Sequence, residues 1–386
     1  MRLLHFSDIH IGMENYAKLD PATGLSTRLL DFFKTFDFIV ETALKEDVDA
    51  VVFAGDAYKT RDPNPTQQRG FAARIKKMAK KIPIVLVVGN HDTPNAEGKA
   101  NTLDIYSALE MDNVHVSRVP ELLNIPTKSG NLQIVTLPWL HKNDYKTVGE
   151  KLNILYNKLD KSSPAIFLSH CEVVGAQYGS EKGMAIQNDV TIPLSLIQDR
   201  RLSYGALGHI HKHQVLSKPS DKPLIIYAGS PHRIDFGEEK EDKGIILVEI
   251  DQKHNASYKF IDTNCRKFLS INITLKAVEK EPTAAILQEL KKYDLTEKII
   301  KLTINIPTSV EGEIQMDKIK KALSSAHFVA GISRNVEKLD RQRLAEGEEV
   351  ERLTPIEALK KYFEAKNYPK EKQKMLEQFA AQILES

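Results

Sequence analysis

Cysteine and long apolar segments are scarce in this sequence, and each scarcity excludes a class of protein. The only cysteines are Cys171 and Cys265, so neither a disulfide framework nor a paired-cysteine zinc site is expected, and both should be reduced thiols. No run of about 18 apolar residues occurs, so we expect no membrane-spanning helix and no membrane partner. The chain begins without an apolar signal stretch, which predicts a cytoplasmic protein.

A nucleotide-binding loop of the form Gly-x-x-x-x-Gly-Lys-[Ser/Thr] is also missing, so the chain itself is not expected to bind ATP. The formal net charge of +2 permits a nucleic-acid partner without requiring one. The 386 residues, of which 41% are hydrophobic and 27% charged, are typical of folded globular proteins with more than one domain.

Short apolar runs alternate with helical patterns through the first hundred residues. Apolar runs at 3–6, 50–54 and 84–88 enclose helical spacing at 28–45 and 66–80. This alternation predicts crossover units and a largely parallel core. Further strands are expected at 132–137, 165–169, 204–207, 224–227, 244–250 and 258–261. The pattern predicts an α/β (α+β) domain over residues 1–262.

The rest of the chain divides into three parts. Residues 263–336 are predicted to form a small α/β module, with strands at 268–275, 298–306 and 328–336 and helices at 283–293 and 316–324. Residues 337–353 form a charged linker, and residues 354–386 a pair of amphipathic helices that begins with a capping box at Thr354 and Glu357. This pair can pack on its own body, dimerise or bind a partner, and the charged linker favours a partner.

Polar residues follow the apolar runs at the points where the strands end, which is where open α/β sheets place their sites. These residues are Asp8, His10, Asp56, Asn90, His91, His170, His209 and His211. Asp8 and His10 are two apart, so in an extended backbone both would face one metal ion. Mixed oxygen and nitrogen donors suit manganese, iron or zinc better than magnesium or calcium.

A pair of metal ions requires a bridging carboxylate, for which Asp56 is the natural candidate. His91 is the candidate proton donor to the leaving group, because its neighbour Asn90 would already bind metal. Each motif alone is more common as an ordinary turn, and it is their joint occurrence after successive strands that predicts a dinuclear metal site.

Together these motifs resemble the full set of the calcineurin-like metallophosphoesterases. The resemblance implies a four-layer sandwich of two mixed sheets flanked by helices, and two Mn²⁺ ions as cofactors. It implies that one ion is held by Asp8, His10, Asp56 and His211, and the other by Asp56, Asn90, His170 and His209. His91 would act on the substrate.

Within that family, residues 1–262 are similar to SbcD-type nucleases of double-strand-break repair. The similarity rests on Asp8-Ile9-His10-Ile11-Gly12, Arg28-x-x-Asp31-Phe32, Ala54-Gly55-Asp56-Ala57-Tyr58, Leu137-Pro138-Trp139 and Tyr227-Ala228-Gly229-Ser230-Pro231. It implies a DNA exonuclease and endonuclease subunit, nucleoid-associated and dimeric. By layout, 263–336 would be a capping domain, and 354–386 would bind an SbcC-type SMC-like ATPase.

Three basic residues, Lys59, Arg61 and Arg233, are candidate DNA contacts, although an exposed solvated face explains them equally well. Lys59 stands where many family members have histidine, and lysine cannot relay protons near neutral pH. Two alternatives to a nuclease are open. One is a phosphodiesterase or phosphatase acting on small nucleotides or phosphoproteins, against which the extra module and helices argue. The other is a non-catalytic scaffold, which should have lost ligands.

Overall fold

The computed structural model describes residues 1–94, 98–140, 144–179, 190–218, 221–277, 279–336, 354–365 and 370–384. The chain divides into two compact units. The first comprises Met1–Ile271, Lys291–Thr303 and Lys320–Ile332, and the second the described parts of Asn272–Leu290, Ile304–Ile319 and Ser333–Ser386. The predicted linker 337–353 lies outside the described residues.

Two six-stranded mixed sheets form the body of the first unit. The first sheet has the order β14 (Ala256–Asp262), β13 (Gly244–Ile250), β1 (Arg2–Phe6), β2 (Ala50–Phe53), β3 (Ile84–Val87) and β4 (Val114–Ser117). Strands β1 to β4 run parallel, as the crossover pattern predicts, whereas β13 and β14 are antiparallel additions.

The second sheet has the order β11 (Gln214–Val215), β12 (Leu224–Tyr227), β10 (Tyr204–Gly208), β7 (Ala165–His170), β6 (Gly130–Leu137) and β5 (Glu121–Thr127). Its central strands β12, β10, β7 and β6 are parallel, and the edge strands pair antiparallel with them. A separate two-stranded sheet joins β8 (Glu172–Val173) to β9 (Thr191–Ile192).

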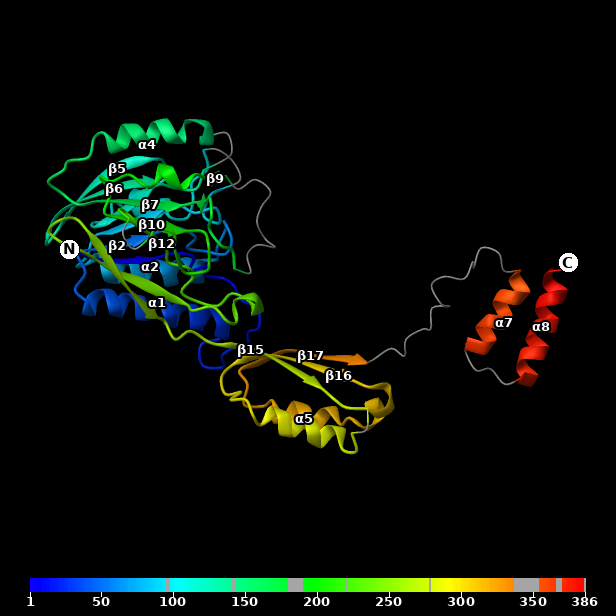
Figure 1. Cartoon of the computed structure of the whole chain (residues 1–386). Helices are drawn as coiled ribbons and strands as arrows, with labels where there is room; N and C mark the ends of the chain where they lie inside the picture. The colour runs from blue at the N-terminus through cyan, green and yellow to red at the C-terminus, as the bar shows by residue number, and fades with distance from the viewer. Residues whose placement is uncertain are drawn as a thin grey trace. The chain divides into compact units, whose positions relative to one another are not determined.

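Three hydrophobic clusters separate four layers, which Figure 1 shows from α4 to α1. Helices α1 (Thr27–Lys45) and α2 (Pro65–Ala79) pack on one face of the first sheet through Phe36 and Phe71. The facing surfaces of the two sheets form the second cluster, and α4 (Val148–Tyr156) covers the outer face of the second sheet. The expected sandwich of two mixed sheets flanked by helices is confirmed.

Several elements were not predicted from the sequence. They are β4, β5, β8, β9, β11, α3 (Asp104–Ala108) and α4. Pro126 lies within β5, and a proline in a strand argues against a central position. Pro126 is compatible with this strand because β5 is an edge strand of its sheet. The others have between two and nine residues, too few for a clear period.

The expected elements of the later chain are present. A three-stranded sheet has the order β15 (Phe268–Thr274), β16 (Ile299–Ile306) and β17 (Phe328–Val336), with α5 (Pro282–Leu290) and α6 (Met316–Ala322) between its strands in sequence. Helices α7 (Pro355–Ala365) and α8 (Lys370–Leu384) follow. The capping box of α7 forms as predicted, since Glu357 Oε2 accepts from Thr354 N at 2.9 Å. Among the described helices, none has both the length and the apolar character that a bilayer span requires.

Candidate metal centre

All eight site residues predicted from the sequence follow or end strands of the two six-stranded sheets. Asp8 and His10 follow β1, Asp56 follows β2, Asn90 and His91 follow β3, His170 ends β7, and His209 and His211 follow β10. Because these parallel strands end at the same edge of the sandwich, their polar side chains converge there. Asp8, His10, Asp56, Asn90 and His170 are buried, whereas His91 is partly exposed.

The backbone at these positions is unusual. Asp8 (φ 53°), His10 (φ 52°), Asp56 (φ 61°) and His209 (φ 98°) are all in the left-handed region, which residues other than glycine rarely adopt. The expectation that an extended strand aligns Asp8 with His10 was therefore wrong, since β1 ends at Phe6. Tight turns, not strand alternation, bring the two side chains together. Strain of this kind clusters at functional sites.

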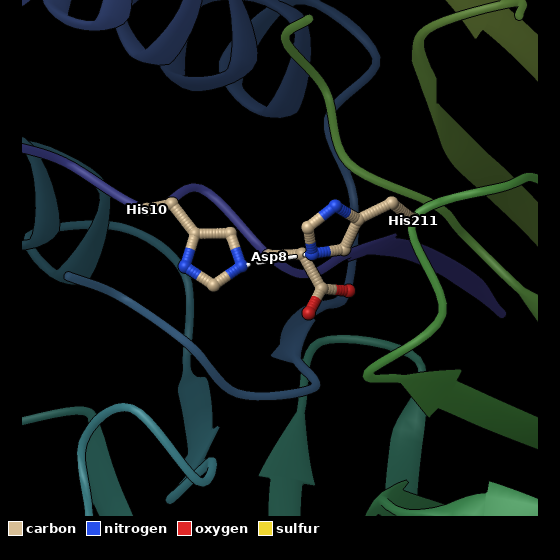
Figure 2. Close-up of side chains that lie close together, drawn as sticks. All are labelled: Asp8, His10 and His211. Atoms are coloured by element: carbon tan, nitrogen blue, oxygen red, sulfur yellow. Dashed lines mark hydrogen bonds between the residues drawn. The ribbon is translucent and has the colours of Figure 1, made fainter. Parts of the chain in front are cut away.

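Asp8, His10 and His211 form the first group of donors. Their ligand atoms lie within 4.8 Å of one another, and His10 Nε2 is 3.0 Å from His211 Nε2. Figure 2 shows a ring nitrogen of His10 directed at a ring nitrogen of His211, with the carboxylate of Asp8 beside them. Two imidazole nitrogens at this distance either share a proton or bind a common cation. The carboxylate of Asp8 is fixed by Ser7 Oγ at 2.6 Å and by the backbone N–H of His209 at 3.1 Å.

Asn90, His170 and His209 form the second group. Asn90 Oδ1 is 2.8 Å from His170 Nε2 and 3.2 Å from His209 Nδ1. His170 Nδ1 donates to the carbonyl oxygen of Ala54 at 2.7 Å, which directs Nε2 into the site. Burial lowers the pKa of His170, but Asp56 and Asp8 outweigh it and raise that pKa above its ordinary value. The surroundings of His170 therefore favour a positive charge, which a metal ion would supply.

Asp56 lies between the two groups. Its Oδ2 is 3.6 Å from His10 Nε2 and 3.5 Å from His170 Nε2. Burial acts to raise the pKa of Asp56, but His170, His91 and His10 outweigh it and hold that pKa below its ordinary value. Burial and His170 lower the pKa of His209 to about 3, so its ring is neutral, as a metal ligand must be. These donors fit two cations that share Asp56.

His91 lies at the partly exposed side of this cluster. Its Nδ1 donates to the carbonyl oxygen of Lys59 at 2.8 Å, and its backbone N–H donates to Asp56 Oδ1 at 2.9 Å. Its ring centroid is 4.8 Å from that of His10. With Nδ1 engaged, Nε2 is the nitrogen that can exchange a proton with a bound substrate.

Two supporting carboxylates were not assigned roles from the sequence. Asp92 is buried and accepts backbone N–H bonds from Asp56, Ala57 and Gly89 at 2.9–3.0 Å, which ties the loops after β2 and β3 together. Glu238 accepts from His211 Nδ1 at 2.8 Å. Burial acts to raise the pKa of Glu238, but His211 and Lys243 outweigh it and lower that pKa to about 2. In the sequence, Asp92 directly follows Asn90 and His91, whereas Glu238 is marked only by a mainly acidic segment at 238–242, which has no ligand spacing.

The three basic residues have different surroundings. Lys59 is partly exposed, and its backbone carbonyl accepts from His91 Nδ1. The guanidinium of Arg61 donates to the carbonyl oxygen of Thr93. Arg233 donates to the carbonyl oxygen of Glu241 at 2.6 Å and to Cys265 Sγ at 3.3 Å. Arg61 and Arg233 therefore also form hydrogen bonds that connect loops around the site.

A family model described as calcineurin-like phosphoesterase matches residues 1–213. The chain is 24% identical to the DNA double-strand break repair protein Mre11 of Sulfolobus acidocaldarius, covering 83% of this chain and 79% of that protein. It is 26% identical to the SbcD component of nuclease SbcCD of Bacillus subtilis, covering 67% of this chain and 68% of that protein. For the same component of Escherichia coli the identity is 24%, covering 76% of this chain and 74% of that protein.

The family match includes all eight predicted site residues, since the last of them, His211, falls before its end at residue 213. It spans more than half of the chain, and the similarity to the repair nucleases extends further. The chain therefore belongs to the calcineurin-like phosphoesterase family of metal-dependent hydrolases, within the group that includes Mre11 and SbcD.

Proposed function

We propose that this chain is the nuclease subunit of an SbcCD-type complex and hydrolyses DNA phosphodiester bonds at DNA ends in double-strand-break repair and recombination, with two Mn²⁺ ions. The observation that carries the proposal is the position of Asp56 Oδ2, about equally far from His10 Nε2 (3.6 Å) and His170 Nε2 (3.5 Å). The relatives named above are repair proteins and nucleases, which supports DNA as the substrate.

In this proposal Asp8, His10, Asp56 and His211 hold one ion, and Asp56, Asn90, His170 and His209 hold the other. When bound, two such ions acidify water and neutralise negative charge on a phosphoryl group. Asp56 stays ionised and shared, because the surrounding imidazoles lower its pKa.

His91 donates a proton from Nε2 to the departing oxygen of the DNA strand. The Lys59 carbonyl supports this role, because it accepts from Nδ1 in both the neutral and the protonated ring and so fixes the ring's orientation. Lys59, Arg61 and Arg233 are proposed to contact phosphates of the DNA.

The test is cleavage of a labelled linear duplex and of single-stranded DNA in Mn²⁺, with a small phosphodiester reporter in parallel. We expect Asp56→Ala to abolish DNA cleavage and His91→Ala to reduce it by about 10²- to 10⁴-fold. His115→Ala is the matched control, because His115 lies exposed on β4. Turnover of the reporter without DNA cleavage, even with the ATPase present, would instead support a small-substrate phosphodiesterase.

The proposed partner is an SbcC-type SMC-like ATPase, bound through α7 and α8. Tyr362, Met375 and Phe379 are exposed on these helices, and Phe379 is 57% exposed, as expected of a surface that a partner covers. A chain ending at residue 353 should lose binding to a coiled-coil fragment of the ATPase while it keeps reporter turnover. Retained binding would refute this assignment.

We also propose a homodimer and a cytoplasmic, nucleoid-associated location. Ile105 on α3 and Leu109 after it are 50% and 69% exposed, which supports an apolar contact between two copies at this helix. Leu109→Asp should convert a dimer to a monomer in analytical ultracentrifugation. A chain that is monomeric without substitution would contradict the dimer.

A further inference from the structure

We propose that strand β15 holds the metal ligand His211 in its binding orientation through the 3₁₀ turn η4 (Phe236–Glu238), in which Glu238 is a positioning residue. The inference rests on the dinuclear metal centre and not on DNA as the substrate. Every residue used below belongs to the first compact unit.

Glu238 determines which nitrogen of His211 faces the site. His211 Nδ1 is 2.8 Å from Glu238 Oε1, and a carboxylate can only accept, so the ring hydrogen lies on Nδ1. Nε2, which is 3.0 Å from His10 Nε2, therefore keeps its lone pair for a metal ion. The other oxygen, Glu238 Oε2, accepts from the backbone N–H of Ile234 at 2.8 Å, so the carboxylate is held at both oxygens.

A buried lysine, Lys243, contacts both Glu238 and the backbone of His211. Lys243 Nζ is 3.1 Å from Glu238 Oε2 and 2.8 Å from Glu241 Oε2. The same ammonium group donates to the carbonyl oxygen of His211 at 3.2 Å. Thus Glu238 restrains the side chain of His211, while Lys243 restrains its backbone. Buried, fully bonded charges of this kind define geometry more than they add stability.

Strand β15 contacts the residues on both sides of Glu238, namely Phe236 in η4 and Glu239 directly after it. On one side, the ring of Phe236 lies 5.0 Å from that of Phe268, edge to face. On the other side, Glu239 Oε1 accepts from the backbone N–H of Ser270 at 2.9 Å. Phe268 and Ser270 are both in β15. Because positions 236 and 239 are attached to β15, the position of Glu238 between them depends on that strand.

A second aromatic contact extends this attachment to the loop after β1. Tyr16 lies 5.5 Å from Phe236 and 5.8 Å from Phe268, centroid to centroid. Tyr16 follows the ligands Asp8 and His10 in the chain. The aromatic cluster of Tyr16, Phe236 and Phe268 therefore connects β15 both to the segment that follows His10 and to the turn whose Glu238 bonds His211.

Removing the Phe268 ring, which contacts Phe236, should therefore weaken metal binding by displacing Glu238. A contact that served stability alone would lower the melting temperature of the metal-free protein without changing metal affinity. A double-mutant comparison separates the two roles, because effects transmitted through one shared residue are not additive.

The experiment uses the full chain and measures Mn²⁺ binding by calorimetry and by electron paramagnetic resonance. We expect Glu238→Ala to weaken binding of one ion by about 10- to 100-fold. The spectrum of a coupled ion pair should then give way to the six-line signal of isolated Mn²⁺. Glu238→Gln, which keeps an acceptor for His211 Nδ1, should recover part of the affinity.

Phe268→Ala should weaken the same ion, and it should add little in the Glu238→Ala background. Phe236→Leu is the milder substitution at the same contact. Phe33→Ala is the matched aromatic control, because Phe33 on α1 packs under Arg74 of α2 and has no ring contact with Phe236 or Phe268 among the described residues. Melting temperatures in chelator report whether each metal-free variant is folded.

Wild-type affinity for both ions in folded Glu238→Ala would overturn the proposal. Additive effects of Glu238→Ala and Phe268→Ala on Mn²⁺ affinity would also overturn it. These measurements use the metal alone and do not depend on DNA. If the variants show the expected changes in Mn²⁺ affinity but the wild-type chain does not cleave DNA, the proposed nuclease activity is refuted and the role of Glu238 is not.

Discussion

At the scale of single residues, the segments that carry the proposed metal ligands have left-handed backbone at residues other than glycine. Asp8, His10, Asp56 and His209 adopt positive φ, and each such residue costs on the order of 1–3 kcal/mol. Hydrogen bonds from neighbouring loops offset this cost, as the bond from Asp8 N to Gly55 O at 2.9 Å does. These hydrogen bonds between loops therefore help to fix the positions of the donors.

Gly89 is a position at which this arrangement leaves no room for a side chain. A Cβ there would lie 2.2 Å from Asp56 Oδ1 and 2.5 Å from Asp56 N. Gly89→Ala must displace the carboxylate of Asp56, so we expect a loss of roughly 1–3 kcal/mol in unfolding free energy together with loss of Mn²⁺ binding. Chemical denaturation and calorimetry measure the two effects.

Gly149→Ala provides the matched control. Its Cβ would meet only Leu196 Cδ2 at an ordinary 3.5 Å, and Gly149 lies in α4, where alanine favours the helix. We expect unchanged metal binding and equal or higher stability. If Gly89→Ala binds two ions as the wild type does, the described packing of Asp56 is incorrect.

His5 predicts a pH dependence of stability. It is buried in β1, and burial lowers its pKa to about 3, against 6.5 in the unfolded chain. Between these values the unfolded chain binds a proton that the folded chain does not, so the stability contribution of neutral His5 is complete above pH 6.5 and is lost as the pH falls. The loss should approach about 1.4 kcal/mol per pH unit.

His5→Asn should make this dependence less steep, because asparagine does not titrate and can still accept from Tyr204. Other buried histidines with a lowered pKa, such as His209 and His232, still contribute to the slope of the variant. The measurement is the unfolding free energy of both metal-free proteins at pH 7, 6 and 5. Parallel pH profiles for the two proteins would show that His5 is not protonated on unfolding.

The sequence was sufficient to single out the donors that the structure brings together, since each one follows a buried apolar run. It was not sufficient for Glu238 and Lys243, because the contacts of Glu238 with His211 and with Lys243 depend on tertiary packing and not on a fixed spacing. The positive φ values at Asp8 and His10 were likewise unforeseen, because neither residue is glycine.

At the scale of elements, the long helices were predictable because periodicity and capping agree. Helix α1 buries Phe32, Phe36 and Ile39 on one face, and Ser26 caps it by accepting from Leu29 N. The predicted start of α1 at residue 28 lies one residue from its observed start at Thr27. Short elements such as α3 and β4 gave no comparable signal, and their places are fixed by packing against neighbouring strands.

Asn64 provides a test of the capping of α2. Its side chain accepts from Gln67 N, and Gln67 Oε1 accepts from Asn64 N, both at 3.0 Å. Asn64→Ala removes one of these bonds and should lower the unfolding free energy by about 1 kcal/mol. Asn64→Asp keeps an acceptor and should be close to the wild type in urea denaturation. Equal losses in both variants would mean that the side-chain oxygen is not the cap.

At the scale of the whole molecule, the sandwich explains why the donors come from both sheets. The core between the sheets places β1, β2 and β3 against β7 and β10, so the ends of strands from both sheets meet at one edge. Asp56 comes from the first sheet and His170 from the second, and they approach to 3.5 Å. Metal binding should therefore stabilise the contact between the sheets, in addition to supplying the chemistry.

The measurement that tests the dinuclear centre most directly is the number of Mn²⁺ ions that one chain binds. We predict two per wild-type chain in a calorimetric titration confirmed by atomic absorption, and fewer in Asp56→Asn, because that variant loses the charge of the shared carboxylate. A wild-type chain that binds one ion or none under the same conditions, or an Asp56→Asn chain that binds two with unchanged affinity, would contradict a dinuclear centre bridged by Asp56.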